Sequence, residues 1–150
     1  MRRNWYKTIY TLLLNSEDAI TASNYPVSTA YIDVSSYSHC AFLVGLGLLD
    51  SALTFQVYQD TSATETASIK ILTGASEVTT ATDDDEVFLI EFATEALDSG
   101  NNFHYVTLTV TGAAGANDYG SIWFFGWNAK TLPVTQPSTF PATNHTILAG

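Results

Sequence analysis

Apolar and polar residues alternate strictly in several short segments of this chain. Between residues 104 and 111, Val106, Leu108 and Val110 alternate with polar residues, mostly threonines, and residues 53–58 follow the same pattern. Successive side chains of a β-strand point to opposite faces of a sheet, so this period of two predicts strands with one buried face.

Further strands are predicted where β-branched and aromatic residues gather between turn residues. Residues 8–20 fit either a strand or one face of a helix. Turn chemistry separates the segments, for example at Thr73-Gly74-Ala75 and at residues 98–102. Because no clear helical stretch intervenes, we predict an all-β protein, an antiparallel β-sandwich of seven or eight strands with a jelly-roll-like arrangement. The additional predicted strands are residues 30–34, 42–49, 68–72, 87–92 and 122–127.

The length of 150 residues favours one domain flanked by arms. We predict an N-terminal arm and first segment over residues 1–27, the sandwich over residues 28–132, and an extended C-terminal arm over residues 133–150. The C-terminal arm is rich in proline and threonine, and its expected contacts with a neighbouring subunit are Pro133, Pro137, Phe140 and Pro141.

Charge is distributed unevenly along the chain. The 15 acidic and 5 basic residues give a net charge of −10, and residues 8–150 carry only two basic residues against all 15 acidic ones. This balance argues against nucleic acid or an anionic membrane as the main partner. The apolar run at Leu12-Leu13-Leu14 is too short for a signal peptide or a membrane span, so we expect a protein that is made inside the cell.

The other three basic residues lie in an aromatic N-terminal segment. We expect this segment to reach onto a neighbouring subunit; the alternative is a frayed terminus with solvated charges. The candidate contact residues are Arg2, Arg3, Trp5, Tyr6 and Lys7.

Two predicted strands, residues 87–92 and 122–127, are apolar on both faces, which implies that a second layer of protein covers the face that does not point into the core. We expect that cover to be another subunit, with a terminal arm or loop of the same chain as the alternative. Trp123 and Trp127 share one strand face and also suggest a platform for stacking on sugar rings. The candidate interface residues are Phe88, Ile90, Phe92, Trp123, Phe125 and Trp127.

Catalytic motifs are weak, and we expect no enzyme activity, no cofactor and no metal. The three histidines, His39, His104 and His145, are scattered in the sequence. The run Asp83–Glu86 lacks the glycine and the distal glutamate of an EF-hand loop, so a solvated turn is expected there. Glu91 with Glu95 or Asp98 remains a possible carboxylate pair of a glycosidase, since the distance between two carboxylates depends on the three-dimensional structure.

Several segments resemble small structural proteins of tailed-bacteriophage virions. The resemblance rests on Ala-Tyr-Ile-Asp-Val-Ser-Ser-Tyr and Phe-Leu-Val-Gly-Leu-Gly within residues 30–53, on the strand at residues 103–111, and on residues 122–133 with Asn128 and Pro133. The chain departs from the family pattern at residues 129–132 and at His104.

The resemblance covers about residues 28–135 and implies a capsid decoration (cement) protein, a homotrimer of β-sandwiches on the surface of the phage head. Its implied partner is the major capsid protein, whose acidic surface the basic and aromatic N-terminal residues would grip. Its implied location is the virion surface, after synthesis in the host cytoplasm, and no catalytic residue is carried over. The alternative roles are a low-copy head–tail connector or tail protein, or a carbohydrate-binding module.

Overall fold

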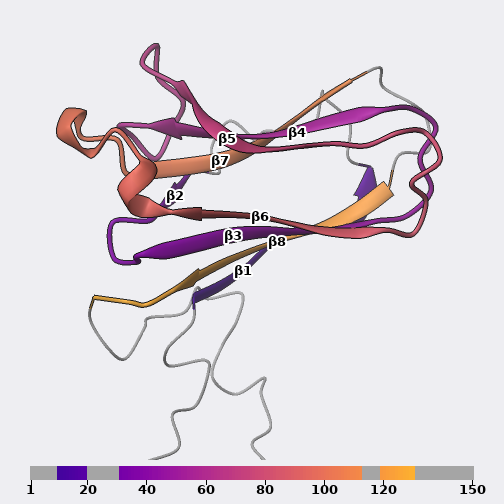
Figure 1. Cartoon of the computed structure of the whole chain (residues 1–150), viewed down its shortest axis with the longest axis horizontal. Coiled ribbons are helices and arrows are strands. Elements are labelled where there is room, and N and C mark those ends of the chain that lie inside the picture. Colours follow the sequence, from indigo (N-terminus) through magenta and orange to yellow (C-terminus); the bar gives the residue numbers. More distant parts are fainter. Residues whose placement is uncertain (1–9, 20–30, 113–118, 131–150) are drawn as a thin grey trace, which may run out of the picture.

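The computed structural model describes residues 10–19, 31–112 and 119–130. These residues form two stacked antiparallel sheets, ordered β1-β8-β3-β6 and β2-β7-β4-β5 (Figure 1). The strands are β1 (Tyr10–Ala19), β2 (Ile32–Asp33), β3 (His39–Leu46), β4 (Leu53–Asp60), β5 (Lys70–Val78), β6 (Val87–Ala93), β7 (Tyr105–Gly112) and β8 (Tyr119–Trp127).

This strand order is that of a jelly roll, in which the first and last strands are neighbours in one sheet. The predicted all-β sandwich is therefore confirmed. The segment that fitted either a strand or a helix forms β1, which pairs with β8 from Tyr10 opposite Gly126 to Ala19 opposite Tyr119. The sandwich thus extends further towards the N-terminus than the predicted range of 28–132.

The core lies between the two sheets and is built from the inward residues of the alternating strands. Phe42 of β3, Phe124 of β8 and Phe55 of β4 are fully buried, and the ring centroids of Phe42 and Phe124 are 5.2 Å apart. Val106, Leu108 and Val110 of β7 complete the opposite wall, as their alternation predicted. Burying each such side chain contributes about 1.5–3 kcal/mol to folding.

The predicted turn at Thr73-Gly74-Ala75 is wrong, because β5 continues through it as a bulge. Gln56 of β4 pairs with Ser76, whereas Tyr58 pairs with Ile71, so β5 carries extra residues at this point. Gly74 has a φ of +82°, a conformation that favours glycine. The Gln56 amide donates to the carbonyl oxygens of Leu72 and Ala75 at 3.0 Å and so satisfies the bulged backbone.

Short 3-10 turns connect β6 to β7 at one end of the sandwich (Figure 1). They are η2 (Thr94–Ala96) and η3 (Ser99–Asn101). The Thr94 amide donates to Ser38 O at 2.9 Å, and its hydroxyl donates to Tyr37 O at 2.8 Å. These bonds fasten the β6–β7 connection to the start of β3.

Candidate functional site

The outward faces of the two sheets differ in chemistry. On the sheet β2-β7-β4-β5, the central strands present polar side chains outward, among them Thr54 and Gln56 of β4 and Thr107 and Thr109 of β7. The Thr109 hydroxyl donates to Gln56 O at 3.0 Å, so part of this polarity is satisfied within the sheet. Of these four residues, Thr54 and Gln56 are partly exposed, whereas Thr107 and Thr109 are only 3% and 8% exposed.

The sheet β1-β8-β3-β6 presents apolar side chains on its outer face. In register, Leu43 of β3 lies between Trp123 of β8 and Leu89 of β6. Val87 and Leu89 are 68% and 52% exposed, and the other members are partly buried. We call this set the outer apolar face; it consists of Leu43, Val87, Leu89, Trp123, Phe125 and Trp127.

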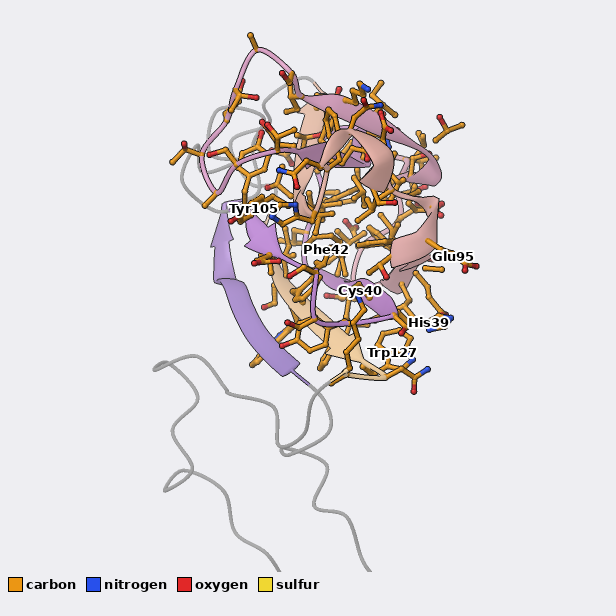
Figure 2. The ribbon with its side chains drawn as sticks, turned by 90° about the vertical axis from the view of Figure 1, so that its left-hand side faces the viewer. His39, Cys40, Phe42, Glu95, Tyr105 and Trp127 are labelled. Carbon is orange, nitrogen blue, oxygen red and sulfur yellow. The ribbon has the colours of Figure 1, made fainter. Side chains whose placement is uncertain are left out.

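The aromatic end of the outer apolar face is bordered by a histidine. The rings of His39 and Trp127 are stacked, with centroids 5.9 Å apart and planes inclined by 19°. Figure 2 shows these two side chains together at the margin of the sheet, whereas Cys40 and Phe42 of the same strand lie closer to the middle of the sandwich. The alternation along β3 therefore separates a surface pair from the core.

The structure divides the predicted subunit-interface residues between the two faces of one sheet. Trp123, Phe125 and Trp127 point outward on β8 and belong to the outer apolar face. Ile90 and Phe92 point inward and are only 5% and 7% exposed, and the Phe88 ring packs edge-on against Phe55 at 5.0 Å. The interface prediction is therefore wrong for Ile90 and Phe92, because the opposite sheet of the same chain covers them, while Phe88 is only partly covered in this way.

The outward residues that the interface prediction left out are Leu43, Val87 and Leu89. A signal for two of them is present in the sequence, since Val87 and Leu89 alternate in phase with Glu91, which is exposed. A charged residue marks the solvent face of a half-buried strand, so Glu91 identifies the outward side of β6.

The predicted arm contacts lie outside the described residues. This applies to the N-terminal set, Arg2, Arg3, Trp5, Tyr6 and Lys7, and to the C-terminal set, Pro133, Pro137, Phe140 and Pro141.

The acidic run before β6 forms a hydrogen-bonded turn. The Thr80 amide and hydroxyl donate to Asp83 at 2.7 and 2.9 Å, and these bonds hold the pKa of the Asp83 carboxyl below its usual value. Asp84 accepts a bond from the Leu49 amide at 2.8 Å. Across residues 10–19, 31–112 and 119–130, no three His, Cys, Asp or Glu side chains are grouped so that they could hold a metal ion.

Cys40 lies in the core beneath the outer apolar face and is fully buried. Burial raises the pKa of its thiol to about 12. The thiolate is the reactive form of cysteine, so this side chain behaves as a small apolar core residue.

Comparison of the chain with protein-family models, with curated proteins and with solved structures finds no match in any of the three. Within the described ranges, no helix is long and apolar enough to span a bilayer.

Proposed function

We propose that this chain is a non-enzymatic structural protein of a phage virion that binds the outside of the head as a decoration protein. The observation that carries the proposal is that apolar side chains gather on three adjacent strands of one outer face, whereas the central strands of the other sheet present mainly threonine and glutamine outward. Jelly rolls occur in viral capsid and lectin domains alike, so the fold by itself does not select a function. The segments that resemble virion proteins supply the assignment to the phage head.

The proposed occupant of the outer apolar face is a second copy of the chain. A net charge of −10 makes copies repel one another over most of their surface. Among the described side chains on this side of the sheet, one exposed acid, Glu91, lies beside the outer apolar face, next to Leu89 on β6. Copies can therefore approach here with little like-charge repulsion while removing Trp123 and Phe125 from water. We propose a homotrimer built through this face.

Self-association tests this part of the proposal. Leu89→Lys should break the oligomer, because it places a charge on an apolar contact; sedimentation of the purified chain measures the effect. Ile71→Lys is the matched control, since Ile71 is also 52% exposed but belongs to β5 in the other sheet. A monomeric wild-type chain, or equal sensitivity to both substitutions, would contradict the proposal.

Copy number in purified particles tests the virion role. Quantitative mass spectrometry should find about one copy of this chain per major capsid subunit. A handful of copies per particle would instead indicate a head–tail connector or tail protein, and absence from the particle would exclude a virion component.

One substitution distinguishes a subunit interface from the sugar-binding platform suggested by Trp123 and Trp127. Trp123→Ala should dissociate the oligomer if the outer apolar face is a subunit contact. An intact oligomer that has lost binding to a glycan would assign the face to carbohydrate instead.

A further inference from the structure

A cavity of about 310 Å³ opens at the end of the sandwich that carries η2 and η3. Three segments far apart in the sequence form it, namely the turn after β2, the β6–β7 connection and the residues that follow β8. Its volume lies at the lower end of the range of small-molecule pockets, about 300–1,000 Å³. It is distinct from the outer apolar face, so its function does not depend on the function proposed above.

Main-chain hydrogen bonds hold these three segments together. The Val34 amide donates to His104 O at 2.9 Å, and the Lys130 amide donates to Ser36 O at 2.9 Å. The Lys130 ammonium group also donates to Ser35 O at 2.5 Å. The cavity is therefore preformed in the fold, which lowers the entropic cost of binding a ligand.

The polar lining offers both a hydrogen-bond acceptor and several donors. His104 Nδ1 lies 2.9 Å from Asn102 O, and because a carbonyl oxygen only accepts, Nδ1 carries the proton. In the tautomer with the proton on Nδ1, Nε2 is the ring nitrogen that accepts. Ser35, Ser99 and the Asn102 amide add hydroxyl and amide groups. A lining that both donates and accepts matches a ligand with several hydroxyl groups.

Lys130 adds a positive charge to this lining. Of its three ammonium hydrogens, the bond to Ser35 O uses one. Among the residues that the structure describes, no acidic residue lines the cavity. Of the carboxylates next to the lining residues in sequence, Asp98 pairs with Lys70 and contacts Asn101, Asp33 accepts from the Ser35 amide, and Glu95 is exposed. Among the described lining residues, Lys130 therefore supplies the one permanent charge, and it is positive.

Leu97 and Phe103 contribute apolar atoms to the lining and retain only 6% and 4% exposure, and Lys70 Nζ lies 4.3 Å from the centroid of the Phe103 ring. A lining that combines apolar and polar atoms suits a sugar ring, which has C–H and hydroxyl groups. The geometry points to a binding site for one carboxylate-bearing sugar unit, with Lys130 binding the carboxylate and with His104, Ser99 and Asn102 binding the hydroxyl groups.

Saturation-transfer NMR on the full chain tests this site with D-glucuronate and D-glucose, which differ only in the carboxylate. Glucuronate should give a saturable signal at millimolar concentration and bind about tenfold more tightly than glucose. Lys130→Gln should remove that preference and leave glucose binding unchanged, whereas Lys130→Arg should restore it. Ser99→Ala should weaken both sugars, with Ser62→Ala, in the exposed β4–β5 loop, as the matched control.

Three results would overturn the assignment. The first is the absence of a saturable signal from either sugar. The second is competition by inorganic sulfate as strong as that by glucuronate, which would mean a simple anion site. The third is loss of sugar binding in Trp123→Ala together with an unchanged preference for glucuronate in Lys130→Gln, which would move the sugar to the outer apolar face.

Discussion

At the residue scale, Asp60 is a buried carboxylate that organises the loop between β4 and β5. It is fully buried and accepts bonds from the Thr61 amide at 2.6 Å, the Thr66 amide at 2.7 Å and the Thr66 hydroxyl at 2.6 Å. Burial raises its pKa, but the bonds from Thr66 and Thr61 together outweigh burial, so the pKa is lowered. The folded state therefore favours the charged form of this side chain.

Asp60→Asn should destabilise the fold by about 1–3 kcal/mol, because it removes charge-assisted hydrogen bonds at a buried site. A lowered pKa stabilises the fold above the unfolded value of 3.8 and loses that contribution as the pH falls below it. The variant should thus lose less stability than the wild type between neutral and acidic pH. Urea unfolding across this range measures both effects, with exposed Glu77→Gln as the control; an unchanged acid profile would contradict the assignment.

Tyr31, in contrast to Asp60, is a buried polar residue whose hydroxyl lacks a hydrogen-bond partner among the described residues. It is 6% exposed. Burial, with smaller contributions from Glu65, Asp60 and Tyr58, raises its pKa from 10.0 to about 12. Its contribution to stability is present below pH 10 and is lost as the pH rises towards 12.

Tyr31→Phe should leave the free energy of unfolding unchanged at neutral pH or raise it by about 1 kcal/mol, since an unsatisfied buried hydroxyl is removed. The decline in stability above pH 10 should also become shallower. Chemical denaturation at neutral and alkaline pH checks both, and a clear loss of stability at neutral pH would reveal a partner for the hydroxyl.

At the element scale, β8 lies close to the residues that precede β3. A Cβ added at Gly126 would lie 2.8 Å from Tyr37 Cγ and 2.9 Å from Cδ2, closer than such atoms can approach. Gly126→Ala should cost about 1–3 kcal/mol through overpacking. Gly100→Ala is the matched control, because nothing lies within 4 Å of the added atom there. Thermal unfolding compares the two, and equal stability would mean that the Tyr37 ring moves aside freely.

At the scale of the whole molecule, the net charge of −10 opposes the self-association proposed for the outer apolar face. Salt screens repulsion between copies but leaves apolar contacts intact, with a Debye length of about 10 Å at 0.1 M and about 30 Å at 0.01 M. The oligomer should therefore tighten as ionic strength rises over this range, as measured by sedimentation. Weakening with salt would mean that ion pairs, such as those of a basic arm, hold the copies together.

Much of the fold was predictable because strand alternation is local. All seven segments predicted as strands contribute residues to strands. The eighth strand, β1, comes from the segment that fitted either a strand or a helix. The Gly74 bulge was not predictable, because glycine suits both a turn and a positive φ inside a strand. Cross-strand pairing with Gln56 and Tyr58, and not the local sequence, selects the bulge.

Which face of each strand is covered depended on the stacking of the sheets. An alternating sequence defines two faces but does not say which one another layer covers, so Phe88, Ile90 and Phe92 could be assigned to an interface although they point into the core. The cavity near Lys130 and His104 could not be predicted either, since its walls come from three segments of the chain.

The sequence by itself determined the period of two, the acidic surface and the sandwich class, because these properties are local or compositional. Only the tertiary structure decided which face of each strand points into the core and which residues assemble the cavity, because both require residues distant in sequence to meet.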